Sequence, residues 1–368
     1  MRVAVIGTGV IGAAVGWELS RRGVDVLFLD RGEPGAGVSN WTFSWVNASN
    51  KTQTREYFDL SVAGMSAHYQ LAAQLGAEEW WHPTGHVRWA ANDAATEALR
   101  ARVTQLTSWG YDAALWEAGQ VARLLEPSVR FPAGDTPVAI YPGEGWIDGR
   151  ALTARLVRDA LRRGARAMLG TSVAEIVTAD GRVTAVVTSD AQRHAVDAVV
   201  NAAGPDGDKV AALVGRPLPM RYEPGLILRL RGPVRPLQRV VHAPHVELRP
   251  DGHGQVVAHS REIDSQLVSH HQFPQALVQD LRALALDVIP ALSGSAVTGA
   301  QAAARPIPAD GFPSVGALDD VPGYYEAITH SGITLAAIIG QVLAREISDG
   351  EVSPLILPYR PGRLRRAA

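Results

Sequence analysis

Apolar and polar positions at the start of the chain follow the order strand, helix, strand. Val3–Ile6 is a run of β-favouring apolar residues, typical of a strand buried on both faces. Ala13–Arg22 has helical composition, and Gly23 after it suits the end of a helix. A second apolar run, Val26–Leu29, ends at Asp30. The pattern therefore predicts a strand–helix–strand unit at the N-terminus.

Helical and strand periodicities both recur along the rest of the chain, and no internal repeat appears. The segments with helical spacing are Thr54–Leu75, Asp93–Trp109, Arg150–Arg163 and Pro274–Ile289, with a last helix expected up to about Ser348. The strand-like segments are Arg166–Leu169, Val173–Val177, Val183–Thr188, Val196–Val200, Leu226–Leu230, Val240–Leu248, Gln255–His259 and Tyr324–Ile328. This mixture predicts an α/β fold, α+β overall.

A glycine motif, Gly7-Thr8-Gly9-Val10-Ile11-Gly12, joins the first strand to the first helix. In a dinucleotide fold its glycines allow a tight turn, close approach of the backbone to a pyrophosphate, and close helix–strand packing. The N–H groups and dipole of the helix then face the phosphates. Asp30 stands where an acid accepts ribose hydroxyls, and it would repel the 2′-phosphate that Arg31 could otherwise meet. The motif predicts a dinucleotide site and disfavours NADP.

Composition narrows the class of protein. A chain of 368 residues suits two domains, and 46% apolar with 20% charged residues is ordinary for a globular enzyme. The net charge of −2 gives no general attraction to nucleic acid. Cysteine is absent, which excludes disulfides, thiolate metal sites and a thiol nucleophile. No apolar run approaches the roughly 20 residues of a membrane span, and the first strand begins at once, so we expect a cytoplasmic protein without a signal peptide.

The choice between FAD and NAD depends on residues beyond the first unit. Gly35–Thr54 is polar and does not continue into the third strand that an NAD domain would have. A turn of small residues, Asn201–Pro205, follows a strand, so the backbone can approach a cofactor there. Near the C-terminus, a helix begins after His330-Ser331-Gly332, and its dipole could stabilise charge on a reduced flavin. These features favour FAD, and a nicotinamide-dependent dehydrogenase is the alternative.

The chain resembles the D-amino-acid oxidase superfamily, which includes glycine oxidase and sarcosine oxidase. The resemblance rests on the N-terminal glycine motif, Asn201-Ala202-Ala203-Gly204-Pro205, Ala304–Pro313 and His330–Leu335, in the family's order. It implies a discontinuous, Rossmann-like FAD-binding domain of the glutathione-reductase type, at residues 1–40, 140–210 and 300–368. It also implies a substrate domain with a helical part (41–139) and an antiparallel sheet (211–299).

The resemblance further implies the chemistry. Family members remove hydride from a carbon that bears an amine, and water hydrolyses the resulting imine to a carbonyl compound plus amine or ammonia. FAD must be non-covalent here, because the thioether of sarcosine oxidase relatives needs a cysteine. The expected FAD contacts are Gly7, Gly9, Val10, Ile11, Gly12, Asp30, Arg31, Ser39, Ser44, Trp45, Val173, Ala202, Ala203, Gly204, Arg305, Ser331, Gly332, Ile333 and Thr334.

Two residues of the family motifs are candidates for holding the substrate. Arg305 aligns with the arginine with which glycine oxidase relatives bind the substrate carboxylate, and a planar guanidinium suits that task. A structural arginine is the alternative. His330 stands where glycine oxidase has a second arginine. It could bind substrate or flavin, and a structural role near the helix N-terminus is the competing interpretation.

Candidates also occur on the expected sheet. His245, Glu247 and Arg249 alternate within one expected strand, so they would share a face. By the resemblance, Glu247 falls near an active-site tyrosine of glycine oxidase, where a carboxylate could bind an amine. His259 and Arg261, expected on the following strand, are similar candidates, although solvent-facing positions are the competing interpretation. The histidine pairs in this region lack the carboxylates of a metal site, so we expect none.

The positions of the lysines bear on whether dioxygen or another molecule accepts the electrons of the reduced flavin. Sarcosine oxidase relatives use a lysine of the substrate domain to help dioxygen react, and this chain has none in 210–368. Lys51 could take its place, or it is a solvated surface lysine. The expected partners are an amine or amino-acid substrate and either dioxygen or another acceptor, with no nucleic acid and no membrane span. A homo-oligomer, and a role as the flavin-binding subunit of a larger dehydrogenase, stay open.

Overall fold

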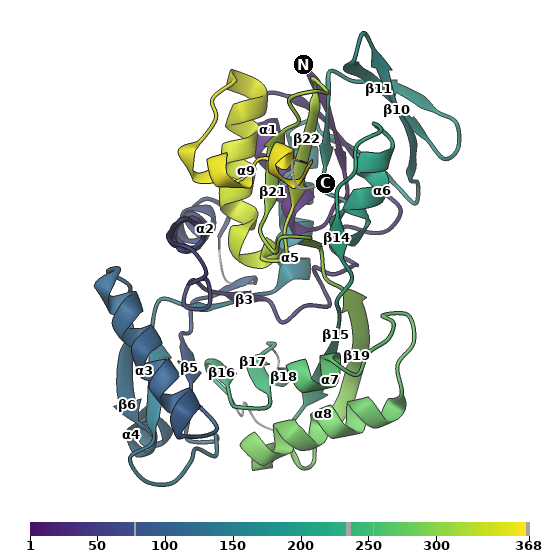
Figure 1. Ribbon diagram of the computed structural model, residues 1–368. Coiled ribbons are helices and arrows are strands. Elements are labelled where there is room, and N and C mark those ends of the chain that lie inside the picture. Colours follow the sequence, from purple (N-terminus) through teal and green to yellow (C-terminus); the bar gives the residue numbers. More distant parts are fainter. Residues whose placement is uncertain (77–78, 233–236, 253, 366–368) are drawn as a thin grey trace.

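The computed structural model describes residues 1–76, 79–232, 237–252 and 254–365 (Figure 1). Its first layer is a six-stranded sheet with the order β21-β22-β13-β1-β2-β9, in which only the edge strand β21 is antiparallel to its neighbour. The strands are β1 (Arg2–Ile6), β2 (Asp25–Asp30), β9 (Arg166–Leu169), β13 (Ala198–Asn201), β21 (Ser314–Ala317) and β22 (Tyr324–Ile328). The sheet thus joins three distant parts of the sequence.

Both faces of this sheet are covered, as the apolar strands predict. One face packs against the helices α1 (Val10–Arg21), α5 (Gly149–Arg162) and α9 (Gly332–Asp349). The other face lies under a small antiparallel sheet of β10 (Val173–Ala179), β11 (Arg182–Thr188) and β12 (Arg193–Ala195). Alternate residues of β1 accordingly enter two different apolar cores.

The second large layer is an eight-stranded sheet with the order β19-β15-β18-β17-β16-β5-β7-β6. Its strands are β5 (His86–Arg88), β6 (Ala114–Glu117), β7 (Pro137–Tyr141), β15 (Pro224–Arg231), β16 (Val240–His242), β17 (Glu247–Pro250), β18 (Gln255–His259) and β19 (Ala296–Ala304). One face packs against α8 (Gln275–Val288) in an apolar core. The opposite face carries Phe43, Ile227, Val240 and Val257, together with the polar residues of the candidate site.

The other helices and strands lie beside and between the two layers (Figure 1). The remaining helices are α2 (Arg55–Leu75), which packs against α9, and α3 (Asp93–Ser108), α4 (Ala118–Leu124), α6 (Gly207–Ala212) and α7 (Arg261–Asp264), with 3₁₀ turns at Gly204–Asp206, Pro290–Leu292, Pro354–Tyr359 and Pro361–Arg365. The remaining strands are β3 (Trp45–Val46), β4 (Trp81–His82) and β8 (Gly145–Ile147), which form one sheet, and the pair β14 (Met220–Arg221) and β20 (Ile307–Pro308).

Two sequence predictions are corrected by the fold. The single strand expected over Val240–Leu248 is two strands, because the chain reverses around Pro244, where the N–H of Ala243 donates to the carbonyl of Val246 (3.0 Å). The stretch 41–139 is not purely helical, since it supplies β5, β6 and β7 to the eight-stranded sheet. The domain boundaries themselves stay a prediction. Within the described ranges, no helix combines the length and apolar character of a membrane span.

Candidate functional site

The glycine motif forms a tight junction between β1, α1 and the turn after β13. Gly7 has a φ of 99°, in the left-handed region, and a side chain there would collide with the carbonyl of Ala202. A Cβ on Gly12 would in turn lie against the carbonyl oxygen of Gly7. Gly9 is the N-cap of α1 and has no side chain to cap the helix, so Ser39 bonds only the N–H of Val10. The next N–H groups in the first turn of α1 stay free to bind a phosphate.

We expect Gly12→Ala to weaken both folding and retention of the cofactor, because the neighbour that must move is backbone. The free energy of unfolding should fall by about 1–3 kcal/mol, the usual range for overpacking. The measurement is thermal unfolding together with the flavin-to-protein absorbance ratio after purification. Gly294→Ala is the matched control, since no atom lies within 4 Å of its added methyl group. Equal effects of the two variants would contradict the prediction.

Polar groups beside the motif have defined partners. The Asp30 carboxylate accepts hydrogen bonds from the N–H of Thr8 (2.6 Å), the hydroxyl of Thr8 (2.8 Å) and the N–H of Gly32 (2.9 Å). The hydroxyl of Ser39 accepts from the N–H of Val10 (2.9 Å). Arg31 forms an ion pair with Asp206. These bonds fix Asp30 at the end of β2 and Ser39 at the start of α1, beside the glycine motif.

A second uncapped helix begins beside the first. At the N-terminus of α9, Ser331 makes no side-chain capping bond, and its hydroxyl bonds Tyr57 instead (2.7 Å). A Cβ on Gly332 would touch Val10 and Ile11, so the N-termini of α9 and α1 lie next to each other. Two adjacent helix ends with positive dipoles fit a cofactor that carries a pyrophosphate and a ring that becomes anionic. The residues present therefore fit FAD.

The other predicted cofactor residues surround this junction or begin the elements next to it. Ala202, Ala203 and Gly204 follow β13, and Val173 begins β10. Thr334 binds the predicted flavin-side segment, because its hydroxyl donates to the carbonyl of Trp45 (3.3 Å). Ser44 adopts a φ of 56°, which is rare for a residue with a side chain, and backbone strain of this kind often accompanies binding sites.

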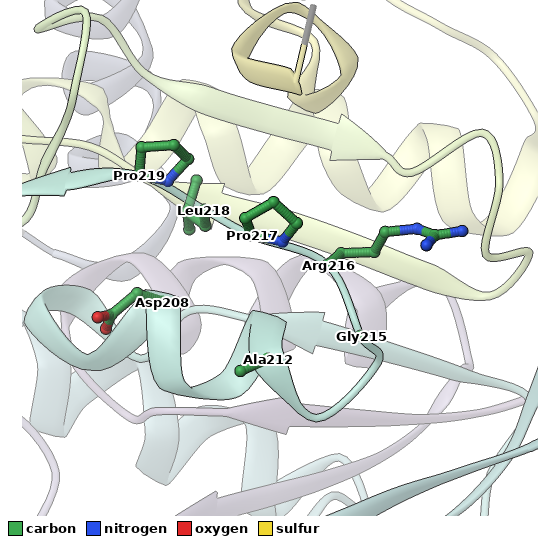
Figure 2. Close-up of a pocket in the computed structure, with 7 residues that line it drawn as sticks. All are labelled: Asp208, Ala212, Gly215, Arg216, Pro217, Leu218 and Pro219. Carbon is green, nitrogen blue, oxygen red and sulfur yellow. The ribbon is translucent and has the colours of Figure 1, made fainter. Parts of the chain in front are cut away.

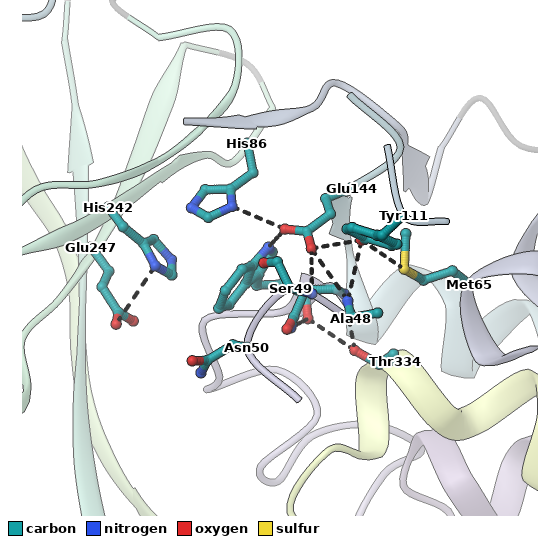
Figure 3. Close-up of polar contacts among 12 residues, drawn as sticks. Ala48, Ser49, Asn50, Met65, His86, Tyr111, Glu144, His242, Glu247 and Thr334 are labelled. Carbon is teal, nitrogen blue, oxygen red and sulfur yellow. Dashed lines mark hydrogen bonds and ion pairs between the residues drawn. The ribbon is translucent and has the colours of Figure 1, made fainter. Parts of the chain in front are cut away.

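The same segment is held by Glu144, a residue that sequence analysis did not single out (Figure 3). Glu144 is fully buried. Its two oxygens accept five hydrogen bonds, from Trp45 Nε1 (3.0 Å), Ala48 N (3.2 Å), Ser49 N (2.9 Å), His86 Nδ1 (2.9 Å) and Tyr111 OH (2.8 Å). Glu144 thus fixes the loop after β3 to the eight-stranded sheet and to the segment after α3.

A row of ionisable residues crosses the face of the eight-stranded sheet. His242, Glu247 and His259 are direct neighbours on β16, β17 and β18. Glu247 Oε2 lies 2.8 Å from His259 Nδ1, and Glu247 Oε1 lies 4.0 Å from His242 Nδ1. Burial opposes ionisation of Glu247, but His242, His259 and Arg261 outweigh it and lower the pKa of this carboxyl group. Arg249 shares this face, as predicted, and donates to the carbonyl of Phe43 (2.5 Å).

The row continues to Arg305. His259 Nε2 lies 2.7 Å from Asp264, and the Arg305 guanidinium forms an ion pair with the same carboxylate. Burial alone would lower the pKa of His259, yet Glu247 and Asp264 on either side raise it to about 9. His259 is therefore an imidazolium near neutral pH. The alternative of a solvent-facing His259 is wrong, because the side chain is buried and its two nitrogens face Glu247 and Asp264.

The raised pKa of His259 predicts a pH dependence of stability. Its contribution is complete below about pH 6.5, the unfolded pKa, and is lost as the pH rises through about 9, because the folded protein holds the proton over that window. The loss is on the order of 3 kcal/mol. Denaturant unfolding at pH 6 and pH 9.5 should show it as a difference between wild type and His259→Gln. A difference that is the same at both pH values would exclude it.

His330, Lys51 and Arg261 complete the group. His330 follows β22 and is solvent-accessible, and its pKa falls to about 3 through desolvation and the charges of Lys51, Arg305, Arg261 and His259. Lys51 is only 8% exposed, so the alternative of a solvated surface lysine is wrong. Burial, and then Arg261, lower its pKa to about 8. Arg261 begins α7 and does not continue β18, which corrects its predicted element.

The remaining predicted residue lies apart from the row. His245 is in the turn before β17, is exposed, and pairs with Glu262 (2.7 Å), so the prediction that it shares a strand with Glu247 is wrong. His86, His242 and Asp264 were missed together with Glu144. Their only signal is an ionisable side chain at or beside an apolar strand, which the sequence pattern cannot tell from a satisfied core residue. The described residues contain no group of three or more side chains arranged to hold a metal ion.

Surface pockets lie elsewhere. Figure 2 shows one of about 440 Å³ between α6 and the segment that follows it, lined by Asp208, Ala212, Gly215, Arg216, Pro217, Leu218 and Pro219. Arg216 is already paired with Asp320 (2.6 Å). The pocket shares no residue with the row or with the two helix ends, and Asp208 is the one carboxylate in its lining.

Comparison with known proteins agrees with this geometry. A family model described as FAD dependent oxidoreductase matches residues 2–346. The chain is 25% identical to the glycine oxidase of Geobacillus kaustophilus, over 97% of this chain and 95% of the relative, and 25% identical to one component of the opine oxidase of Agrobacterium tumefaciens, over 95% and 94%. The crystal structure of that glycine oxidase superimposes with a TM-score of 0.87 at 22% identity, covering 98% of each chain. Iminodiacetate oxidase of Chelativorans sp. BNC1 gives 0.84 at 21% identity, over 98% and 99%.

Proposed function

Because the chain belongs to the DAO family of FAD-dependent oxidoreductases, we propose that it oxidises the C–N bond of an amino acid or N-substituted amino acid. Bound FAD supplies the acceptor for the two electrons and the proton that leave the substrate carbon as hydride. An amino-acid substrate agrees with the named activity of glycine oxidase, and an N-substituted one with that of iminodiacetate oxidase.

One observation carries the proposal. The charges of Arg305, Lys51, Arg261 and His259 all act on His330, which directly precedes the uncapped N-terminus of α9. Two of these cations come from β18 and the end of β19, one from α7 and one from the loop after β3. They gather at the helix end where the reactive ring of the coenzyme is expected. A substrate held by its carboxylate at this point would have its neighbouring C–N carbon near the ring.

The proposed roles follow from the partners of each side chain. Arg305 orients the substrate carboxylate, because Asp264 and the carbonyl of Pro224 (3.3 Å) already fix the plane of its guanidinium. Glu247 attracts the substrate amine from β17. His330, which is neutral at pH 7 because its pKa is about 3, lines the substrate position without adding charge.

Anaerobic mixing of the purified protein with a panel of primary and secondary amino acids tests the proposal. We expect at least one of them to bleach the visible absorbance of the flavin within a turnover time, while the matched carboxylic acids without an amine leave it unchanged. A protein that holds FAD but is reduced by none of them would support a non-catalytic subunit instead. Reoxidation of the reduced protein by air then shows whether dioxygen or another acceptor takes the electrons.

A further inference from the structure

Lys51 is a buried cation without a counter-ion of its own. Its side chain is 8% exposed, and none of the residues that the structure describes accepts a hydrogen bond from its ammonium group or places a carboxylate within 4.0 Å of it. Its close neighbour is the ring of Tyr57, 5.7 Å from the nitrogen. Most of the side chain is removed from water, while the ammonium group at its tip has no hydrogen-bond partner in the described parts of the chain and is free to bind an anion.

The lysine faces the candidate site. Its nitrogen lies 5.7 Å from the ring of Tyr57, whose hydroxyl bonds Ser331 (2.7 Å), the residue that follows His330. Arg261 reaches the site from α7, 3.7 Å from Glu247, and 75% of its side chain is accessible. Lys51 and Arg261 therefore enter the site from different elements, and the charge of each lowers the pKa of His330.

The carboxylates of this region have other partners. Asp264 pairs with Arg305 and His259, and Glu247 lies 2.8 Å from His259 but 3.7 Å from Arg261. The oxygens of Glu144 are filled by five donors. The positive charge of Lys51 thus has no carboxylate within 4.0 Å among the described residues, and that of Arg261 has only Glu247, at 3.7 Å.

We propose that Lys51 and Arg261 form a second anion-binding subsite, which holds a negatively charged group on the side chain or N-substituent of the substrate. This inference rests on the proposed function, because it places the first carboxylate at Arg305. The substrate class is then an amino acid with two anionic groups, one on each side of the carbon that is oxidised. A carboxylate or phosphonate has the charge and the acceptor oxygens that an ammonium and a guanidinium bind.

Binding of dicarboxylates that cannot be oxidised tests the subsite. The probes are diglycolate and its homologues with one and two extra methylenes, in which an ether oxygen replaces the amine, each compared with its monomethyl ester. Titration calorimetry and flavin absorbance changes give the dissociation constants on the FAD-loaded protein. We expect the best diacid to bind at least tenfold more tightly than its monoester in the wild type.

Lys51→Met should reduce this preference to within about twofold, because it removes the ammonium group that only the second anionic group of the diacid can reach. Arg261→Gln, at an exposed position that tolerates substitution, should reduce it about two- to fivefold. Lys209→Met is the matched control, because Lys209 is the chain's other lysine, is exposed, and pairs with Asp206. It should leave both affinities unchanged.

The preference should also depend on pH. Since the pKa of Lys51 is about 8, the advantage of the diacid should be present below that pH and decline as the pH rises through it. The charged and titratable groups that face Lys51 are Arg261, Glu144, Glu247, His330 and Tyr57. Titration of the other groups changes the affinities of the diacid and the monoester alike, so it cancels in the ratio of the two dissociation constants. The pH dependence of that ratio then reports the charge of Lys51.

Two results would overturn the subsite. One is a diacid series in which no member gains over its monoester. The other is a Lys51→Met protein that keeps the preference but reacts more slowly with dioxygen after reduction, which would assign the lysine to the electron acceptor. Neither depends on turnover of an amino acid, so a failure of the proposed function, seen as absent flavin reduction, is recognised separately.

Discussion

Glu144→Ala should lower the free energy of unfolding by about 3–5 kcal/mol, the range for removing one partner from a buried charged network. The substitution removes the acceptor that five donors share, and Trp45 Nε1, the N–H of Ser49 and His86 Nδ1 have no other partner among the described residues. The N–H of Ala48 and the hydroxyl of Tyr111 keep only longer contacts of 3.4 Å. Water cannot replace the lost acceptor easily, because the position is fully buried. Denaturant unfolding at pH 7, with flavin retention as a second measurement, gives the result.

Glu144→Gln keeps the size and shape of the side chain but replaces one acceptor oxygen with an NH2 group, so it shows how much of the loss comes from the missing acceptor. Its remaining oxygen can still accept from Ala48 and Ser49, but its amide nitrogen faces Trp45 Nε1, which is a donor and cannot adapt. The loss should therefore be smaller, about 1–3 kcal/mol. Glu97→Ala, at an exposed glutamate paired with Arg100, is the control and should stay within about 0.5 kcal/mol. Equal stability of Glu144→Ala and this control would refute the argument.

The sequence predicted most strands of the parallel layer because they are continuous apolar runs, although the edge strand β21 was not predicted. The strands Tyr324–Ile328 and Arg166–Leu169 have the predicted bounds, and α2 begins one residue after the predicted start of its helical segment, with Thr54 as its N-cap. The eight-stranded sheet was predicted less well. β5 and β16 have three residues each, too few to show the alternation of apolar and polar positions that marks a strand. Their parallel pairing also joins parts of the chain about 150 residues apart.

The candidate site divides in the same way. The glycine motif is local in sequence, so its residue types and spacing predicted the turn between β1 and α1, whereas Arg305 became a candidate only through the resemblance to the family. The ion pair between Arg305 and Asp264 could not be predicted, because Asp264 lies on a different element and the two residues meet only in the folded chain. The burial of Lys51 likewise depends on packing beside Tyr57, whereas its sequence surroundings, from Asn50 to Thr54, are polar.

The orientation of Arg305 makes a specific demand on any residue that replaces it. Its Nη2 donates to Asp264, whose carboxylate also accepts from the His259 imidazolium, while Nη1 donates to the carbonyl of Pro224 (3.3 Å). A guanidinium can satisfy these partners and still present N–H groups to a carboxylate, because it has five donors in a fixed plane. Lysine keeps the charge but has three donors and no plane, so it cannot do both.

Arg305→Lys should therefore reduce kcat/KM for the best amino-acid substrate by about 10²- to 10³-fold, or about 3–4 kcal/mol of transition-state binding. Most of the loss should appear in KM, and it should be nearly absent for the corresponding amino amide, which has no carboxylate to orient. Arg130→Lys, at an exposed arginine paired with Asp287, should change neither value. Steady-state kinetics with acid and amide on the three proteins measures these ratios. If Arg305→Lys slowed the acid and the amide equally, Arg305 would have to act on the fold or on the coenzyme, and the carboxylate of the substrate would need another partner.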